Sequence, residues 1–379
     1  MLTLEGCRDR QNRLRAKLSA EGIDAVVLTD HLEIYYLTGV LLCAFPAFHF
    51  PAFLYFETDG GSWLAAHTGE GDALVDDRVT YEWHIMSTMN PDPVRQLDKA
   101  VASRLSGGKP VSRIGWQEEG LDRLLAETVD ARLSPDAWAP VDDLLAGLHK
   151  RKDADELALL RKSVEVDLAA YTRAQEVIEP GVNELDVLAE AQQAAMKEAG
   201  EVVYHGGDYR AGVIGGTARD RKIEAGELYI IDAQSTYRGY WSDLARTFAV
   251  GGQPTDLQTS VYEHLAAILR DVPGLVRPGE SATGLWKTID ARIREHTHLA
   301  DSGLIHHGGH GVGLRAHEAP DINRDRDAVF EVGDVFSCEP GAYSDDLRAG
   351  IRLENTFAVT PEGVETLSDY PLDIMPFKG

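Results

Sequence analysis

Apolar and polar residues follow different patterns in the two parts of this chain. Over residues 1–150, segments with helical spacing of apolar residues stand between short runs of β-branched and aromatic residues. Such runs, bounded by glycine and charged residues, are typical of buried strands. This first part is therefore predicted to be an α/β domain. Its expected elements are a helix over 7–21 and strands over 25–28, 34–39, 53–56 and 63–66.

The second part, residues 151–379, follows a charged linker at 149–153 and begins with a long amphipathic segment. Apolar residues recur there with the period of a helix, and the same period returns in three later segments. Strand-forming runs lie between and after these segments, which favours helices outside an antiparallel sheet, an α+β architecture. The helices are expected over 155–178, 184–200, 257–270 and 284–296.

A hairpin predicted within residues 228–250 brings two carboxylates together. Its strands are rich in β-branched and aromatic residues and flank a polar turn. With the turn centred between Tyr237 and Arg238, Asp232 is expected directly opposite Asp243. Directly opposed residues share a face of the sheet, with Cβ atoms about 4.5–5.5 Å apart. Two carboxylates held that close repel each other unless one is protonated or a cation lies between them, so this hairpin indicates a metal site.

A second hairpin near the C-terminus repeats this arrangement with glutamates. Two strand-forming runs again flank a polar turn. Centring that turn between Asp346 and Leu347 places Glu339 opposite Glu354. The two-residue period of a strand also puts Arg352 on the face of Glu354. Four carboxylates are therefore expected on two hairpins of one domain.

Between the hairpins, His310 stands in the sequence GGHGVG. Glycines allow other groups to approach the backbone closely. Taken alone, this residue could be a structural loop histidine, and each carboxylate could be a solvated strand end or a partner of a nearby arginine. Together, four carboxylates and one imidazole form a hard, oxygen-rich ligand set. That set suits a pair of divalent ions such as Mn²⁺, with Co²⁺, Fe²⁺ or Zn²⁺ as alternatives.

Composition and charge narrow the classes of function. The chain has 379 residues, enough for two domains with cores of their own, and a formal net charge of −25. This charge argues against nucleic acid and anionic membranes as partners. Its three cysteines form no even set of disulfides, and the sequence shows no signal-peptide core and no bilayer-spanning stretch. A cytoplasmic protein is expected.

The candidate residues and their flanking sequences resemble the pita-bread metallopeptidases, a family that includes methionine aminopeptidase, aminopeptidase P and prolidase. The ligand order of that family is Asp, Asp, His, Glu, Glu. Here His310 lies in GHGVGL, Glu339 in CEPG and Glu354 in IRLENT, while HEAP contains His317. The short interval between the two glutamates is similar to the proline-specific branch. The sequence IDAVVLTDHLEIYYLTG resembles the start of the creatinase-type N-terminal domain.

This resemblance implies an architecture and a set of ligands. A smaller creatinase-like domain over 1–150 would precede a pita-bread catalytic domain over 151–379, and the chain would form a homodimer. The aromatic segment 45–53, FPAFHFPAF, is either core and strand edge or a loop that covers the active site of a partner subunit. The implied ligands are Asp232 for one ion, His310 and Glu339 for the other, and Asp243 and Glu354 as bridges between them.

Further residues resemble groups that act on the substrate. His317 is expected to hydrogen-bond the substrate or the tetrahedral intermediate, with a purely structural role as the alternative. Arg352 is similar to an arginine near the substrate in the proline-specific branch, and a buried partner of the carboxylates is the equal alternative. His306 matches a substrate-contacting histidine, although His307 stands where relatives carry glycine. Two ions lower the pKa of a shared water, and Glu339 would carry its proton to the leaving nitrogen.

Two departures from the family pattern concern the substrate rather than the ions. Relatives carry a Pro-His pair shortly before the first ligand strand, and that histidine helps to hold the substrate. Within residues 212–220, glycines occupy the place expected for it, and His205 lies about ten residues too early. Gln234 also stands where a glycine is usual. Both departures leave the predicted ligands in place and put a peptide substrate in question.

Three functions are compatible with these observations. The first is a dinuclear metal-dependent hydrolase that cleaves the amide bond before proline in Xaa-Pro dipeptides or short peptides, with a hydroxide shared by both ions. The second is an enzyme that uses the same ions on another small-molecule amide or on a lyase substrate. The third is a non-catalytic binding protein, and retention of all five ligands argues against it. The first is the leading prediction.

Overall fold

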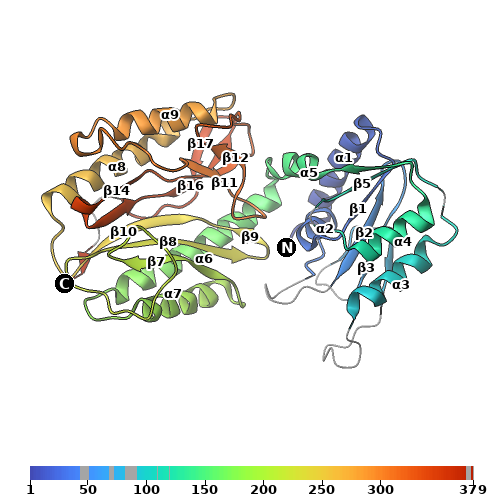
Figure 1. Ribbon diagram of the computed structural model, residues 1–379, viewed down its shortest axis with the longest axis horizontal. Coiled ribbons are helices and arrows are strands. Elements are labelled where there is room, and N and C mark those ends of the chain that lie inside the picture. Colours follow the sequence, from blue (N-terminus) through green and yellow to red (C-terminus); the bar gives the residue numbers. More distant parts are fainter. Residues whose placement is uncertain are drawn as a thin grey trace. The chain divides into compact units, whose positions relative to one another are not determined.

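The computed structural model describes residues 1–42, 51–67, 72–81, 92–108, 110–118, 120–372 and 377–378. Most of the aromatic segment 45–53 lies outside these residues, so both interpretations of it stay predictions. Packing divides the chain into two units, Met1–Leu148 and His149–Gly379 (Figure 1). None of the helices in the described part is both long enough and apolar enough to cross a membrane.

The first unit is built around a six-stranded mixed sheet. The strands are β1 (Ala25–Leu28), β2 (Ala52–Glu57), β3 (Ser62–Ala66), β4 (Asp77–Val79), β5 (Arg113–Trp116) and β6 (Ala137–Pro140). They lie in the order β4-β3-β2-β1-β5-β6, with β1 antiparallel to β2 and parallel to β5. All residues of the central strand β1 are buried, as expected for a strand covered on both faces.

Helices cover this sheet. They are α1 (Leu4–Ala20), α2 (His31–Thr38), α3 (Pro93–Leu105), α4 (Arg123–Leu133) and α5 (Asp142–His149). Leu97 of α3 and Val129 of α4 pack with Phe53 and Trp63 of the sheet in one buried cluster. The predicted helix over 7–21 is confirmed as α1, and the α/β character of this unit is confirmed with it.

The strand predicted at 34–39 is wrong, because this segment forms most of helix α2. Asp30 caps the helix by accepting a hydrogen bond from the Leu32 N–H, and Gly39 ends it in the left-handed conformation with φ of +79°. Every residue over 33–38 is buried. The segment therefore lacks the polar face that identifies a helix in a sequence, and its continuous apolar character resembled a buried strand.

The second unit consists of two halves, each with two helices packed on an antiparallel sheet. The elements of the first half are α6 (Ala154–Val177), α7 (Glu184–Ala199), β7 (His205–Ala211), β8 (Leu228–Tyr237), β9 (Tyr240–Trp241) and β10 (Leu244–Val250). The helices of the second half are α8 (Asp256–Leu275) and α9 (Ala282–Ile293). All four predicted helices are thus confirmed, although α8 continues past its predicted end.

The strands of the second half are short. They are β11 (Gly309–Gly311), β12 (Glu318–Ile322), β13 (Val335–Cys338), β14 (Gly341–Ser344), β15 (Ala349–Arg352), β16 (Asn355–Thr360) and β17 (Gly363–Thr366). Five of them form a sheet in the order β12-β11-β13-β16-β17, and β14 pairs with β15. Short 3-10 helices lie at Thr297–Leu299 and Asp345–Leu347, and β18 (Phe377–Lys378) pairs with β10.

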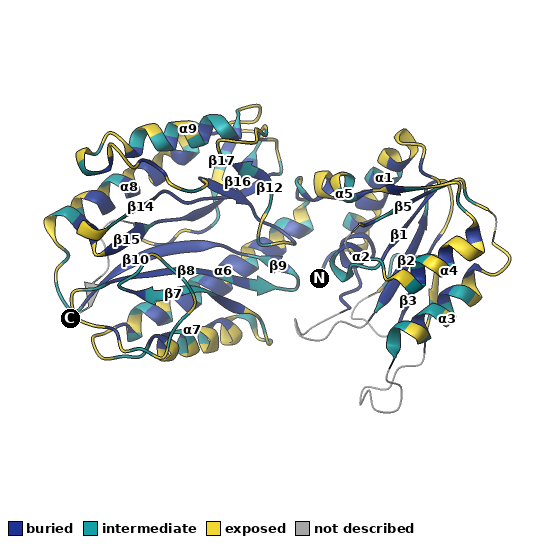
Figure 2. Ribbon diagram, in the orientation of Figure 1, coloured by how far each residue is buried: buried dark blue, intermediate teal, exposed yellow. Residues whose placement is uncertain are grey.

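Each half has its own core. Helices α6 and α7 pack on β7, β8 and β10, and helices α8 and α9 pack on the strands of the second half. Figure 2 shows β10 and most of β8 buried, while the helices keep exposed outer surfaces. The two sheets meet where the Glu354 N–H donates to the Ala245 carbonyl at 3.0 Å. Residues at this junction come from both hairpins.

The predicted register of the first hairpin is wrong by two residues. The pairing of β8 with β9 and β10 places Asp243 level with Gln234 instead of Asp232. The turn is centred between Arg238 and Gly239, whose φ angles are +48° and +86°. Two-residue hairpin turns with both φ angles positive match the strand twist and favour glycine second. A shift of two residues keeps both aspartates on one face.

The predicted register of the second hairpin is confirmed. Cys338 pairs with Asn355 between β13 and β16, and β14 with β15 keeps the same register. Glu339 and Glu354, which stand between these paired segments, are therefore level with each other. The turn uses the 3-10 helix Asp345–Leu347, as the polar residues at that place indicated.

Candidate metal centre

A cavity of about 210 Å³ lies where the two halves of the second unit meet. It gathers all five predicted metal ligands and two of the predicted substrate-contacting residues. Asp232 and Asp243 come from the first half, whereas His310, Glu339 and Glu354 come from the second. The full lining is Gly207, Asp208, Asp232, Gln234, Asp243, His307, His310, His317, Glu339, Arg352 and Glu354.

The candidate ligands form two overlapping groups. The ligand atoms of Asp232, Asp243 and Glu354 all lie within 4.8 Å of one another. Those of His310, Glu339 and Glu354 also lie within 4.8 Å of one another. Glu354 belongs to both groups, so the arrangement can hold two cations that share a carboxylate. The family resemblance implies the same sharing for Glu354, whereas the shared role that it implies for Asp243 stays a prediction, because Asp243 is not grouped with Glu339.

Three oxygens of two buried carboxylates lack hydrogen-bond partners among the described residues. Oδ1 of Asp243 and both carboxylate oxygens of Glu354 accept no hydrogen bond from the described residues. The two residues are 2% and 1% exposed. Buried polar atoms are nearly always hydrogen-bonded, and an unpaired buried charge is strongly destabilising. Burial, together with the charges of neighbouring carboxylates, raises the pKa of both groups well above the ordinary value. These oxygens therefore fit a divalent cation.

His310 is prepared to act as a ligand through Nε2. Its Nδ1 lies 3.0 Å from the Gly311 carbonyl and donates to it, which leaves the Nε2 lone pair directed toward the carboxylates. Nε2 is 3.6 Å from Oδ2 of Asp243 and 3.7 Å from Oε1 of Glu339. Burial lowers the pKa of His310 to about 4, so the imidazole is neutral at neutral pH.

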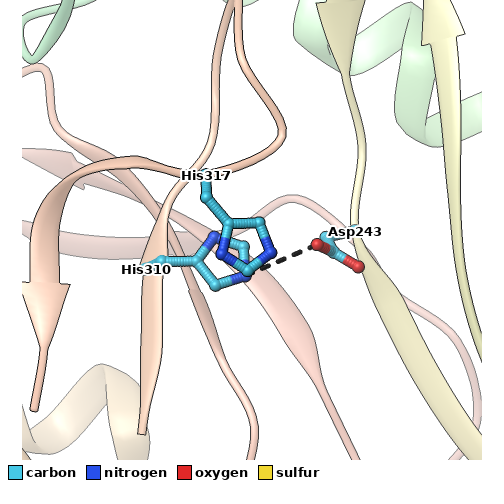
Figure 3. A group of neighbouring side chains, drawn as sticks. All are labelled: Asp243, His310 and His317. Carbon is cyan, nitrogen blue, oxygen red and sulfur yellow. Dashed lines mark ion pairs between the residues drawn. The ribbon is translucent and has the colours of Figure 1, made fainter. Parts of the chain in front are cut away.

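Glycine is required beside this histidine. Gly309 has a φ of +141°, and a Cβ there would collide with the Ser337 carbonyl of β13. The short strand β11 therefore lies close against β13 and places the His310 side chain in the cavity. His317 stacks on that ring with 3.6 Å between the ring centroids and 12° between the planes (Figure 3). A nitrogen of His317 lies within the same 4.8 Å group as His310 and Asp243.

Glu339 is surrounded by histidines. Nδ1 of His307 lies 3.1 Å from Oε1 of Glu339, and Nδ1 of His306 lies 4.0 Å from Oε2. Burial by itself raises the pKa of Glu339, but the hydrogen bond and charge of His307, with the other histidines, lower it below the ordinary value. Glu339 is therefore ionised and able to accept a proton. No role was predicted for His307 from the sequence. The feature that could have indicated one is a histidine at a position where the family has glycine.

His306 does not line this cavity. It lines a neighbouring one, next to Trp286. Its Nδ1 donates to the His307 carbonyl at 2.6 Å, so its Nε2 accepts from the Tyr343 hydroxyl at 3.1 Å. That hydroxyl in turn accepts from Nε of Arg352 at 2.7 Å. His306 therefore contacts the cavity through other side chains.

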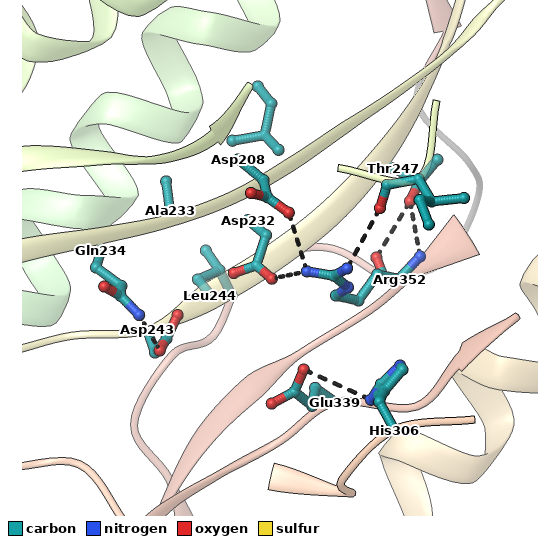
Figure 4. Close-up of polar contacts among 12 residues, drawn as sticks. Asp208, Asp232, Ala233, Gln234, Asp243, Leu244, Thr247, His306, Glu339 and Arg352 are labelled. Carbon is teal, nitrogen blue, oxygen red and sulfur yellow. Dashed lines mark hydrogen bonds and ion pairs between the residues drawn. The ribbon is translucent and has the colours of Figure 1, made fainter. Parts of the chain in front are cut away.

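Arg352 lies between two carboxylates of the first half (Figure 4). Its Nη1 donates to Oδ2 of Asp232 and to Oδ2 of Asp208, the second at 3.3 Å. Asp208 was not predicted from the sequence, because no motif marks it and strand β7 was not predicted. The burial of Asp232 raises its pKa to about 6 although Arg352 opposes that shift. Both predicted alternatives for Arg352 remain open, since it lines the cavity and also pairs with carboxylates.

The residues concerned in the two departures from the family pattern lie in different parts of the fold. Gln234 lines the cavity and donates from Nε2 to Oδ2 of Asp243 at 2.7 Å. His205 is outside the cavity. It is buried beneath α6, with hydrogen bonds to the hydroxyls of Ser235 at 2.8 Å and Tyr209 at 2.6 Å. No histidine among the described residues takes the position that the family's Pro-His pair would supply.

Comparisons with known proteins agree with this geometry. The model of metallopeptidase family M24 matches residues 158–361, and that of the creatinase/prolidase N-terminal domain matches residues 10–148. The Xaa-Pro dipeptidase of Pyrococcus furiosus is 30% identical over 368 residues, which is 95% of this chain and 98% of that protein. The Xaa-Pro dipeptidase of Pyrococcus horikoshii is 27% identical over 361 residues, with 93% and 94% covered.

Solved structures show the same fold. The prolidase from Pyrococcus horikoshii superimposes with a TM-score of 0.76 at 22% identity, covering 97% of this chain and 99% of that one. The dipeptidase PepE from Mycobacterium ulcerans gives a TM-score of 0.73 at 24% identity, covering 99% of both chains. The predicted fold, a creatinase-like domain followed by a pita-bread domain of the α+β class, is confirmed.

Proposed function

This chain belongs to metallopeptidase family M24, and we propose that it is a dinuclear hydrolase that cleaves the amide bond before proline in Xaa-Pro dipeptides or short peptides. The observation that carries the proposal is the pair of overlapping ligand groups that share Glu354. Two relatives named Xaa-Pro dipeptidase, which match over nearly their whole length, support the substrate. We assign residues 1–150 to the N-terminal domain and 151–379 to the catalytic domain.

Family membership implies divalent metal ions, and we propose two per chain, with Mn²⁺ as the leading choice. Asp232 would hold one ion, His310 and Glu339 the other, and Asp243 and Glu354 both. The hard oxygen-rich donor set and the unpartnered buried oxygens of Asp243 and Glu354 support this assignment. When bound, such ions supply a water nucleophile at neutral pH and polarise the scissile carbonyl.

The protein side chains would accept and donate the proton of the attacking water. Glu339 is ionised, and its Oε2 has no hydrogen bond to His307, so this oxygen would accept the proton of the attacking water. It would then deliver the proton to the leaving nitrogen, because a group that acts as a base in one step can act as an acid in the next. His307 would hold the other oxygen of Glu339 and keep the carboxylate oriented.

The remaining residues would orient the substrate. His317 is exposed toward the cavity, and burial of part of its ring lowers its pKa, so it would donate a hydrogen bond to the substrate carbonyl as a neutral imidazole. Arg352 would lie beside the bound peptide. His306, acting through Tyr343, would fix the direction of the Arg352 guanidinium.

We also propose that the protein works in the cytoplasm as a homodimer. The acidic composition and the three cysteines support a reducing compartment. The dimer rests on the resemblance to the proline-specific branch.

The test is hydrolysis of matched peptides by the Mn²⁺-loaded full chain. We expect cleavage of Xaa-Pro dipeptides or Xaa-Pro-Yaa tripeptides and none of the corresponding Xaa-Ala peptides. The variant Asp243→Asn should lose the activity, whereas Asp220→Asn, an exposed carboxylate outside the cavity, should keep it. Absence of turnover in protein shown to hold two ions per chain would refute the proposal and direct the search to non-peptide amides.

A further inference from the structure

Asp208 is a carboxylate of the cavity that the metal chemistry does not use. It lies on β7 directly opposite Asp232 of β8, so both side chains point to the same face of the sheet. It lines the cavity, and its side chain is 28% exposed. Among the described residues, the groups able to hold a metal ion do not include it. Its place in the cavity therefore needs an explanation other than metal binding.

The Asp208 carboxylate occupies space that Gly215 leaves free. Gly215 has a φ of +146°, and a Cβ there would collide with Oδ2 of Asp208. The same Cβ would lie 3.6 Å from Nη2 of Arg352. Gly215 belongs to the stretch where the family resemblance leads one to expect a substrate-holding histidine. A carboxylate from a neighbouring strand thus stands where a side chain of this stretch would enter the cavity.

The N–H donors of Arg352 that could otherwise bind a ligand already donate to groups of the protein. Nη1 donates to both Asp208 and Asp232, Nη2 donates to the Ile214 carbonyl at 3.3 Å, and Nε donates to Tyr343. A guanidinium binds a free carboxylate through two parallel N–H donors. Here the protein's own carboxylates and carbonyl already accept from both terminal nitrogens, as the dashed lines of Figure 4 show for the carboxylates.

The charges of the cavity lead to the same conclusion. Its lining contains five carboxylates, and Arg352 is the only arginine or lysine among its described residues. With the cavity's histidines neutral, two divalent cations would balance four carboxylates, and Arg352 would balance the fifth, which is Asp208. Without Asp208, the guanidinium would carry an unbalanced positive charge toward the ligand. A carboxylate placed beside it would then be attracted, whereas beside Asp208 it is repelled.

We propose that Asp208 is a specificity-determining residue, which neutralises Arg352 so that the site favours peptides without a free carboxylate at this end. The preferred substrates would be Xaa-Pro units followed by a further residue or a carboxamide, and free dipeptides would be poor substrates. This inference rests on the proposed function and specifies its substrate class.

The experiment compares Ala-Pro with Ala-Pro-NH₂, two peptides that differ only in the charge of the C-terminal group. The Mn²⁺-loaded wild type should show the higher kcat/KM for the amide. In Asp208→Asn, KM for the free acid should fall by about tenfold, the scale of one added charge-assisted contact, while KM for the amide changes little. Asp220→Asn removes the same charge outside the cavity and should leave the ratio unchanged.

Several results separate this inference from its alternatives. An unchanged ratio in both Asp208→Asn and Asp208→Ala, with both variants folded by circular dichroism and holding two ions, would overturn it. Equal loss of both activities would also overturn it and make Asp208 a positioning residue for Arg352. If the wild type cleaves neither peptide, the proposed function fails, but calorimetry still tests the inference. Asp208→Asn should then bind L-proline about tenfold more tightly than the wild type, with L-prolinamide unchanged.

Discussion

The hairpin of β8 with β10 and the hairpin formed by β13 to β16 each bring two carboxylates to the cavity, but they hold them differently. In the first, Asp232 and Asp243 are two residues apart in register, and each has a polar partner, Arg352 and Gln234. In the second, the two glutamates are level, and the carboxylate oxygens of Glu354 accept no hydrogen bond from the described residues.

This difference shows which hairpin depends more on bound ions. In the first hairpin, one oxygen of each carboxylate has a side-chain partner, which is Gln234 of the same hairpin for Asp243 and Arg352 of β15 for Asp232. These two carboxylates are therefore partly satisfied without metal. The second hairpin contains the fully buried Glu354 carboxylate, whose two oxygens accept no hydrogen bond in the described part of the chain, so a cation or a proton would stabilise it. Burial and neighbouring carboxylates raise the pKa of Glu354 accordingly. Glu354, the proposed shared ligand, is therefore expected to be the residue most sensitive to the presence of the ions.

The largest expected effect is the difference between a variant of Glu354, the proposed shared ligand, and a variant of Asp232, a proposed ligand of one ion. Glu354→Gln should lose both ions and reduce kcat/KM by more than about 100-fold, because loss of even an outer-shell group can cost that much. Asp232→Asn should retain one ion. Metal analysis of the purified variants by mass spectrometry measures this directly. Two ions retained by Glu354→Gln would contradict the assignment of a shared ligand.

An intermediate effect concerns the metal-free protein. Burial raises the pKa of Asp232 to about 6 and those of Asp243 and Glu354 well above their ordinary values. Between the unfolded pKa near 4 and these raised values, the folded state binds more protons than the unfolded chain, so metal-free stability falls as pH rises. Chelation should lower Tm more at pH 7.5 than at pH 5, by on the order of 5 °C.

Thermal melting with and without chelator at the two pH values gives this comparison. The double variant Asp243→Asn with Glu354→Gln serves as the control in metal-free melts. Because it lacks two of the three titrating groups, its metal-free Tm should change less between the two pH values than that of the metal-free wild type. A chelation effect that is equal at both pH values, or larger at pH 5, would be incompatible with the raised pKa values.

The smallest expected effect compares the two turns. Gly239→Ala places a side chain at a φ of +86° and should reduce the free energy of unfolding by about 1 kcal/mol, with the metal content unchanged. Arg348, in the second turn, already has a φ of +60° without being glycine. Arg348→Gly should change stability by less than about 1 kcal/mol, since relief of strain offsets the added flexibility of the unfolded chain. Urea titration of both variants measures the difference, and equal losses would remove the distinction.

Local sequence was enough to predict several features. The four helices of the second unit follow from helical periodicity, and the register of the second hairpin follows from its polar turn. The register of the first hairpin also had a local signal. Arg238-Gly239 matches a two-residue turn with glycine second, and the prediction missed it by centring the turn one residue too early. Helix α2 was missed because its burial on all sides is a tertiary property.

The sequence by itself determined the candidate ligand set, its order along the chain and the face of each hairpin that carries it, because these depend on residue identity and strand period. Only the tertiary structure decided which side chains from distant segments meet. It paired Asp208 with Arg352 across 144 residues, placed His307 against Glu339, and left His306 in a neighbouring cavity. The contact of Asp208 depends on the packing of one half against the other, and those of the histidines depend on packing within the second half. No local periodicity records either kind of packing.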